Sequence, residues 1–393
     1  MNPRFRSRQE KGLDGKKMVI QLSNIHTCNN FSIKNLLILL VSVSVSFFTF
    51  SPSANANEKI LQFRLGGIQS KIGTNFAELI APKDQRPILP NADEKFQKNF
   101  SEITSHRNNI AFLFFDGEKL RAEKYNHNAD SSTPLFLYSI TKSVTGLMLL
   151  QEICQRSDIS LDDTIGLYSD RLEKTVYGKV SIRNALKMQS GVGEDFFKNT
   201  QKQMFISFLR LEKTPLDWIK GIADKKPEGQ HFWYNANDTN AIGVLLEDLS
   251  GKSIVDNFSE KFVHLSRVSS SVYWQQAKNG EAIGAYGLMA TPRDAISLAV
   301  KYLEILDTNK CVESHFNQMF KADKSDGKYG FQIWRHQTIE TSDTSKFYMA
   351  GHGGQYLIMN RNSGSVAFIY SVFRDYSSKS VIDVFYKTLN RLL

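Results

Sequence analysis

The chain has 393 residues, of which 41% are hydrophobic, enough to build a sizeable folded core. Its formal net charge is +9, but residues 1–56 hold seven of the 49 basic and two of the 40 acidic residues, which leaves 42 basic and 38 acidic residues and a net charge of +4. The basic character therefore lies mostly in the N-terminal segment, and nucleic-acid binding loses its main support.

The apolar segment 35–50 is typical of a signal peptide. Basic residues precede it, and Ser53-Ala54-Asn55-Ala56 follows it with the A-x-A pattern of a cleavage site. The segment is shorter than the roughly 20 apolar residues that a membrane helix needs. We therefore predict a signal peptide over residues 1–56 and a periplasmic or secreted protein that meets the membrane only through this export signal. A retained N-terminal anchor is the alternative, and Met18 is a second candidate start.

The cysteines give little information about compartment or metal binding. Cys28 lies in the predicted signal peptide, and only Cys154 and Cys311 remain. Two cysteines do not make a disulfide framework, so a bond between them stays open but is not favoured. The sequence contains no H-E-x-x-H, no C-x-x-C and no histidine cluster with metal-ligand spacing. We therefore predict no metal and no cofactor.

From residue 57 onward, the elements in chain order predict an α+β fold. Residues 57–105 are polar and are expected to wrap the surface of the main domain, residues 106–393. An Asp-Gly turn between two strand-like runs predicts a hairpin at 110–125. A continuous apolar run predicts a helix at 139–156. Capping residues, among them Ser181 and Thr291, and amphipathic patterns predict further helices, and the C-terminal part is rich in strand-like segments: helices at 180–191, 238–251, 253–263, 291–306 and 380–392, and strands at 330–334, 347–351, 355–359 and 366–371.

This order places strands at both ends of the main domain and helices between them. We therefore predict an antiparallel sheet formed by both chain ends and flanked by helices, with an inserted all-helical lobe at about 150–290.

Ser139 and Lys142 stand three residues apart at the start of the predicted 139–156 helix. On a helix these positions share a face, so the hydroxyl and the amine would lie side by side near the N–H groups of the helix N-terminus. A hydroxyl beside a base can act as a nucleophile, and a buried lysine shifts readily toward its neutral form. The pattern alone is weak, because Ser325 and Lys328 repeat it in a polar turn. A helix cap with a solvated lysine is the alternative.

Two further segments could complete such a site. Tyr234 precedes the predicted 238–251 helix and could supply a phenol near Lys142 as a general base. The glycines of segment 351–355 let a backbone approach a substrate closely, and a strand edge there could supply an oxyanion N–H. The alternatives are an aromatic residue packed under the start of a helix and a plain β-turn.

The three motifs occur in the order and approximate spacing that are typical of the serine β-lactamase and penicillin-binding superfamily. The motifs of that superfamily are S-x-x-K, then Y-x-N or S-x-N, then K-T-G or H-x-G. The chain resembles the class C β-lactamase and esterase branch, since its second motif begins with tyrosine, and within that branch the 6-aminohexanoate-dimer hydrolase group. The supporting segments extend over about residues 110–390: LYSITKSVTG, VSIRNALKMQSGVGEDF, PEGQHFWYNANDTNAIGVLLEDLSGKS, AIGAYGLMATPRDAISLA, YGFQIW and GHGGQY.

The resemblance implies roles for individual residues. Ser139 would be the acylated nucleophile, Lys142 the cation or proton shuttle beside it, and Tyr234 the general base and later the acid toward the leaving group. The backbone N–H groups of Ser139 and Gln355 would form the oxyanion hole. Substrate-binding positions would be His352, which replaces the lysine of the third motif, and Gly353, Gly354 and Asn237. Asn237 could equally be a loop residue, with Asp238 as the helix cap.

Two departures from the family pattern bear on the substrate. Position 236, where Y-x-N places asparagine, is alanine, and His352 replaces a fixed positive charge by one that depends on pH. Both changes weaken recognition of a β-lactam carboxylate. We expect an exported, monomeric serine hydrolase that cleaves an ester or amide bond in a small-molecule or short peptide-like substrate. The alternatives are a peptidoglycan-directed D,D-peptidase or weak β-lactamase, and a non-catalytic binding or sensor protein that keeps the fold.

Overall fold

The computed structural model describes residues 75–83, 88, 93–106, 108–193, 213–320, 324–335, 343–371 and 378–389. The predicted signal peptide, residues 1–56, lies outside the described residues. Within the described part of the chain, no helix is both long and apolar enough to cross a membrane.

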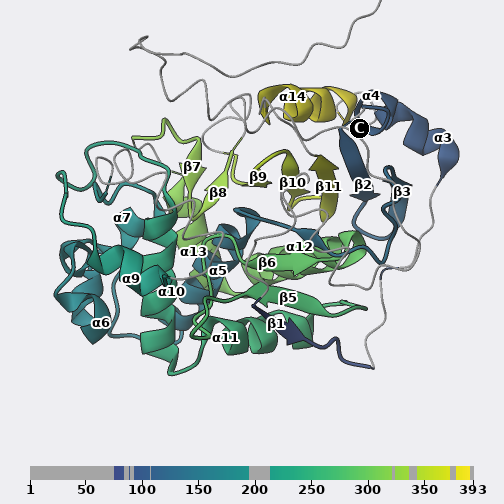
Figure 1. Ribbon diagram of the computed structural model, residues 1–393. Coiled ribbons are helices and arrows are strands. Elements are labelled where there is room, and N and C mark those ends of the chain that lie inside the picture. The colour runs from purple at the N-terminus through teal and green to yellow at the C-terminus, as the bar shows by residue number, and fades with distance from the viewer. Residues whose placement is uncertain are drawn as a thin grey trace, which may run out of the picture. The chain divides into compact units, whose positions relative to one another are not determined.

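A seven-stranded antiparallel sheet joins the two ends of the main domain (Figure 1). Val366 in the last strand lies opposite Phe115 in the early hairpin, so the hairpin pairs directly with the last strand. This pairing confirms the predicted α+β class and the sheet built from both chain ends. The strand order is β3-β2-β11-β10-β9-β8-β7, with β2 Asn109–Phe115, β3 Leu120–Tyr125, β7 Tyr329–Gly330, β8 Ile333–Trp334, β9 Lys346–Gly351, β10 Gln355–Asn360 and β11 Ser365–Ser371.

Helices cover both faces of this sheet, which explains why all seven residues of β2 are buried. Phe112 and Phe114 of β2 belong to one apolar cluster, with Phe385 of α14 (Ser378–Leu389). Leu113 and Phe115 alternate with them and belong to the main core cluster. In Figure 1, α14 lies above the sheet and α12 (Pro292–Thr308) below it.

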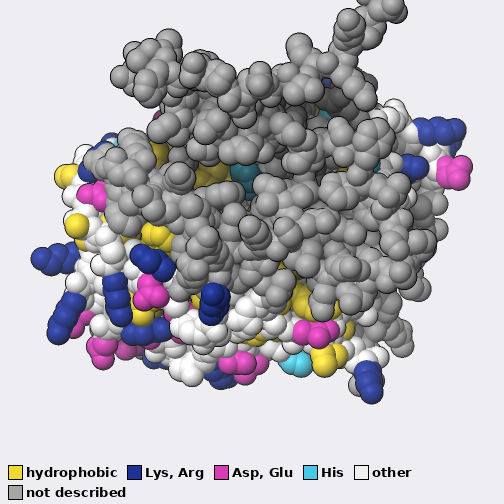
Figure 2. All heavy atoms as spheres, in the orientation of Figure 1, with side chains coloured by type: hydrophobic (Ala, Val, Ile, Leu, Met, Phe, Trp, Pro, Cys, Tyr) yellow, Lys and Arg dark blue, Asp and Glu magenta, His cyan; other side chains and the backbone are white. Residues whose placement is uncertain are grey.

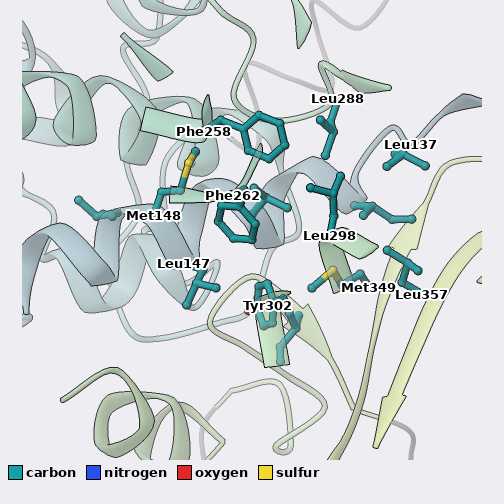
Figure 3. Packing of buried hydrophobic residues seen from close by; sticks show 14 of the residues in the cluster. Leu137, Leu147, Met148, Phe258, Phe262, Leu288, Leu298, Tyr302, Met349 and Leu357 are labelled. Atoms are coloured by element: carbon teal, nitrogen blue, oxygen red, sulfur yellow. The ribbon is translucent and has the colours of Figure 1, made fainter. Parts of the chain in front are cut away.

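The helix that carries Ser139 and Lys142 runs through the main core. This helix, α5 (Ile140–Ile153), buries thirteen of its fourteen residues. Figure 3 shows Leu147 and Met148 of α5 among side chains of other elements, including Phe258 of α11 (Ile254–Lys261) and Tyr302 of α12. A helix that is apolar on all sides is expected inside a core, as the continuous apolar run predicts.

A second sheet shows that the expectation of an all-helical lobe at 150–290 was wrong. Its strand order is β1-β5-β6-β4. Both β5 (Val272–Gln275) and β6 (Leu288–Ala290) fall inside the lobe, while β1 (Phe76–Leu79) comes from the predicted wrapping segment and β4 is Leu135–Phe136. Runs of three or four residues are too short to show a period, and these strands are defined by partners far away in sequence.

Several of the remaining helices begin at a residue whose side chain caps them. Ser181 and Thr291 cap their helices as predicted, and Gly251, with a φ of +69°, ends α10 (Ala236–Ser250). The alternative in which Asp238 caps this helix was wrong. The cap is Asn235, whose Oδ1 accepts the N–H of Asp238 at 2.9 Å, and α10 begins at Ala236. These remaining helices are α3 Glu94–Gln97, η1 Lys98–Phe100, α4 Ser101–Thr104, η2 Ile165–Leu167, α6 Asp170–Glu173, η3 Val176–Lys179, α7 Ile182–Leu186, α9 Pro215–Lys220, α10 Ala236–Ser250, η4 Val263–Leu265 and α13 Lys310–Met319.

Basic and acidic side chains are mixed on the surface. Figure 2 shows them interspersed over the described part of one face. Arg171 pairs with Glu247 at 3.1 Å and with Asp248 at 2.7 Å, so that part of its charge is locally compensated. Pairs of this partly exposed kind add only modestly to stability.

Cys154 and Cys311 form a disulfide, which the sequence did not favour. Cys154 is the C-cap of α5, and Cys311 lies in the first turn of α13 (Lys310–Met319). The two residues are 157 positions apart, and nothing in a sequence of two spare cysteines reveals that the fold brings them together. The bond ties the C-terminal end of α5 to α13.

Removing this bond should destabilise the protein. We expect the double variant Cys154→Ser, Cys311→Ser to lose about 2–5 kcal/mol of unfolding free energy, because the bond restricts a long loop of the unfolded chain. Urea denaturation of both proteins measures the difference. Dithiothreitol should bring the wild type to the level of the variant and leave the variant unchanged; equal stability of the two oxidised proteins would contradict the expectation.

Candidate active site

Ser139 stands at a sharp turn from strand to helix. The N–H of Leu137 still donates to Leu288 in the second sheet at 2.9 Å, whereas the N–H of Ile140 already donates to Leu137 as the first helical bond, at 3.1 Å. Between them, Tyr138 has a φ of +47°, a left-handed conformation that costs a residue with a side chain on the order of 1 kcal/mol. The turn puts Ser139 at the N-cap position of α5.

Lys142 lies against Ser139, as the three-residue spacing predicts. Its Nζ donates to Ser139 Oγ at 3.2 Å and to the carbonyl of Ala285 at 2.7 Å. The side chain is only 3% exposed, and burial lowers the pKa of Lys142 to about 7. Because burial disfavours the charged amine, both the neutral and the charged form are populated near neutral pH.

Tyr234 is held over this pair by other aromatic rings. The Lys142 Nζ is 5.4 Å from the centroid of the Tyr234 ring. The same ring packs against Tyr329 at 5.7 Å and Trp334 at 5.3 Å, both from the β7–β8 hairpin. The structure therefore brings together the three residues that the sequence assigns to catalysis.

A cavity of about 260 Å³ opens beside these residues. Ala350 and Gly351 at the end of β9 line it, together with His352 in the following turn; the other lining residues are Ser139, Tyr234, Trp334 and Tyr348. His352 is exposed, and its ring lies 6.2 Å from that of Tyr138. Of the predicted substrate-binding positions, His352 thus reaches the cavity.

Gly353, Gly354 and Asn237 are not among the lining residues. Gly353 and Gly354 have φ values of +93° and +105°, and they form the turn between β9 and β10. Asn237 is 4% exposed and lies in the first turn of α10, because that helix begins earlier than its pattern suggested. Their role in substrate binding therefore stays a prediction that this cavity does not support.

The N–H of Gln355 is directed into the sheet, so it is not available at the cavity. Gly354 accepts the N–H of Ser371 at 3.0 Å, which fixes which residues of β10 bond to β11. In an antiparallel sheet the bonded residues alternate, so Gln355 turns its N–H and C=O toward its partner Gly351 in β9. The prediction that Gln355 supplies an oxyanion N–H was therefore wrong, because the pairing of β10 turns this N–H toward β9.

Ala350 has the opposite orientation. The same alternation turns its N–H and C=O away from β10, toward the edge where β8 pairs with β9 only through Trp334 and Tyr348. Beyond that pair the edge of β9 borders the cavity and the turn before Ser139. A Cβ on Gly351 would come within 2.6 Å of the Leu137 carbonyl, so glycine is required for this close approach.

Asp238 lies behind the site with its carboxyl buried. The sequence suggested it only as a possible helix cap. Its Oδ1 accepts the Tyr177 hydroxyl at 2.7 Å and the Ser190 hydroxyl at 2.6 Å. The side chain is fully buried, which raises the pKa of Asp238 to about 6. The carboxyl joins η3 and the 187–193 loop to the start of α10, four residues after Tyr234.

Within the described ranges, one group has ligand atoms close enough for a metal ion: Cys154, Cys311 and His315. Both sulfurs are joined in the disulfide and therefore supply no thiolate. This cluster lies at the far end of α5 from Ser139.

The arrangement around Ser139 can be compared with known proteins. The sequence model of the beta-lactamase family matches residues 94–382, well over half of the chain. The chain belongs to the beta-lactamase family. It is thus a serine hydrolase with the β-lactamase fold, as the three motifs predicted.

Solved structures share this fold. A protein named as a 6-aminohexanoate-dimer hydrolase from Bacillus anthracis superposes with a TM-score of 0.69 at 18% identity, covering 87% of this chain and 98% of that one. A penicillin-binding protein from Bacillus halodurans gives 0.56 at 16%, covering 76% and 100%. A D-stereospecific amidohydrolase from a Streptomyces species gives 0.54 at 16%, covering 74% and 97%. No curated protein sequence matched the chain.

Proposed function

We propose that this beta-lactamase family member hydrolyses an ester or amide bond through an acyl-enzyme on Ser139, with Lys142 and Tyr234 as the proton-transfer pair. The observation that carries the proposal is the contact of Lys142 Nζ with Ser139 Oγ at 3.2 Å, combined with burial that lowers the pKa of this lysine to about 7. A neutral amine at hydrogen-bond distance from a hydroxyl can act as its general base.

In the proposed acylation, Ser139 Oγ attacks the carbonyl carbon of the substrate and gives its proton to Lys142. The carbonyl oxygen becomes an oxyanion. When the tetrahedral intermediate collapses, the bond to the leaving group breaks, and the leaving oxygen or nitrogen takes the proton from Lys142 by way of the Tyr234 hydroxyl. Water then attacks the acyl-Ser139 ester and gives a proton to the same base. The bond between the acyl carbon and Ser139 Oγ breaks, Oγ takes this proton from the base, and the acid leaves the restored enzyme.

The oxyanion would be stabilised by two backbone N–H groups, those of Ser139 and Ala350. Ser139 precedes the first bonded amide of α5, so its N–H is not used by the helix. Ala350 takes the place first assigned to Gln355, since its N–H is directed to the edge of β9 that borders the cavity. Each such donor typically contributes a factor of about 10²–10³ to kcat.

Cavity size and lining favour a small substrate group. A cavity of about 260 Å³ exceeds the roughly 150 Å³ that holds benzene and is smaller than most drug-sized pockets. Two of the similar structures carry amide-hydrolase names. These names favour an amide or ester of a short acyl group. Cleavage of a D,D-peptide or a β-lactam is the alternative to be tested.

We also propose that the protein is exported and works as a periplasmic or secreted monomer. The disulfide between Cys154 and Cys311 supports export, because such bonds persist mainly in oxidising compartments. The signal-like segment within residues 1–56 supports it independently.

Labelling of Ser139 tests the proposal directly. We expect a fluorophosphonate probe to label the wild type and p-nitrophenyl acetate to be hydrolysed, with both activities lost in Ser139→Ala. Ser314→Ala, at an exposed serine of α13, is the matched control and should keep both. Nitrocefin and a D-Ala-D-Ala peptide separate the alternatives. A protein that no probe labels and that cleaves none of these substrates would be a binding protein.

The pH dependence identifies the form of Lys142 that reacts. If the neutral amine is the base, the rate constant of Ser139 acylation should rise with pH, with a midpoint near 7, because this lysine deprotonates there. Stopped-flow measurements of acylation between pH 5.5 and 9 follow this rise of the rate constant with pH. The rise should be absent in Lys142→Met. A rate that falls above pH 7 would instead assign the charged amine as the active form and leave Tyr234 as the base.

The oxyanion assignment predicts a specific effect of proline at position 350. Ala350→Pro removes the N–H that points away from β10 without breaking the β9–β10 ladder, and we expect kcat to fall about 10²–10³-fold. Ala350→Gly keeps the N–H and serves as the control. Steady-state kinetics on p-nitrophenyl acetate measure both variants, and near-normal kcat in the folded proline variant would remove Ala350 from the oxyanion hole.

A further inference from the structure

The turn of the β7–β8 hairpin is built from residues that do not favour it. Phe331 and Gln332 are the two central residues, with φ values of +54° and +62°. Two-residue hairpins with positive φ at both positions usually contain Asn-Gly or similar pairs, because other side chains crowd the backbone there. A strained conformation of this kind persists only where the surroundings stabilise it.

Gln332 supplies that stabilisation, because all its polar atoms are hydrogen-bonded while the residue is 2% exposed. Its side-chain Oε1 accepts the Thr239 hydroxyl at 2.7 Å. Its Nε2 donates to the carbonyls of Ala185 at 3.1 Å and Leu186 at 2.9 Å. Its own carbonyl accepts the Ser143 hydroxyl at 2.6 Å, and its N–H donates to Leu186 at 3.3 Å.

These partners lie on three helices around the active site. Ser143 follows Lys142 on α5, Thr239 lies on α10 five residues after Tyr234, and Ala185 is in α7. The packing is close on the α5 side, because a Cβ added to Gly146 would lie 2.9 Å from Cγ of Gln332. One glutamine thus fixes the hairpin against the helix of the nucleophile and against the helix that follows the tyrosine.

The hairpin in turn carries the rings that hold Tyr234. Tyr329 and Trp334, on either side of the turn, are 4.7 Å apart and both contact the Tyr234 ring. Tyr234 lies over the buried amine of Lys142. A shift of the turn would therefore move the aromatic wall of the cavity and open Lys142 to water.

We propose that Gln332 is a positioning residue for the reaction: it sets the aromatic wall of Tyr329 and Trp334, and with it Tyr234, at its place over Ser139 and Lys142. This role explains the glutamine of the YGFQIW segment. It also explains the orientation in which Trp334 lines the cavity. The inference rests on the proposed function of Ser139 and Lys142.

The test replaces Gln332 by methionine, which has a similar shape and none of the polar atoms of the amide. We expect the acylation rate constant on p-nitrophenyl acetate to fall about 10- to 100-fold, with KM changed by less than about threefold, because misplacement of catalytic groups chiefly lowers kcat. The pH midpoint of acylation should move above 7, since looser packing exposes Lys142. A residue that only stabilises the fold would leave this midpoint unchanged.

Three further variants keep the test decisive if Gln332→Met folds poorly. Thr239→Val removes one hydrogen bond to Gln332, and Gly146→Ala pushes its Cγ while keeping every polar group; both should lower the rate constant and raise the midpoint by smaller amounts. In the Gln332→Met background, Thr239→Val should add no further loss. Gln275→Met, a fully buried glutamine of β5 whose side chain has no partner among the described residues, is the matched control and should change neither quantity.

The outcomes separate the two proposals. A wild type that fluorophosphonate does not label overturns the proposed function and this inference with it. A wild type that is labelled, beside folded Gln332→Met and Thr239→Val variants with unchanged rate constant and pH midpoint, overturns the role of Gln332 alone. Loss of rate with an unchanged midpoint also overturns it, because the wall over Lys142 would then be intact.

Discussion

The burial of one amine, that of Lys142, is the constraint on which the site depends. A fall of its pKa from 10.5 to about 7 corresponds to a cost on the order of 5 kcal/mol for keeping this amine charged inside the protein. Because the folded-state pKa is lowered, the protein binds fewer protons than the unfolded chain between pH 7 and 10.5. The free energy of unfolding therefore decreases as pH falls from 10.5 to 7, because the unfolded chain takes up a proton that the folded protein does not. The Ala285 carbonyl at 2.7 Å and the Ser139 hydroxyl at 3.2 Å give the buried amine the polar partners that replace water.

The backbone around this amine is held in conformations that an isolated chain would avoid. Tyr138 is left-handed just before Ser139, and Phe331 and Gln332 are left-handed at the hairpin turn. Gly351 is packed against the Leu137 carbonyl where no side chain would fit. Each is stabilised by neighbouring contacts rather than by local preference, which is characteristic of functional sites. A residue such as Gln332, far from the reacting atoms in sequence, is then needed to keep the parts together.

Local patterns predicted much of this structure. The early hairpin, the core helix after Ser139 and the caps Ser181 and Thr291 follow from turn residues and apolar runs that act over a few positions. The oxyanion N–H could not be predicted, because the sequence does not show that Gln355 lies on β10, between β9 and β11, whereas Ala350 lies on β9, whose edge lines the cavity. The strands β5 and β6, the disulfide and the partners of Asp238 depend on contacts between distant segments, and these leave no local signal in the sequence.

The structure also gives a physical meaning to the two departures from the family motifs. At the second motif, Asn235 is occupied as the cap of α10 and position 236 is alanine, so no amide of this segment lines the cavity. At the third, His352 stands exposed at the rim. Lys142, whose amine contacts Ser139, is buried and already donates to the carbonyl of Ala285. The described lining thus offers a substrate carboxylate no permanent positive charge, whereas the rings of Tyr234, Trp334 and Tyr348 offer apolar contact to a neutral acyl group. The balance of desolvation therefore favours uncharged esters and amides over β-lactams, whose carboxylate would lose its hydration without gaining a fixed cation.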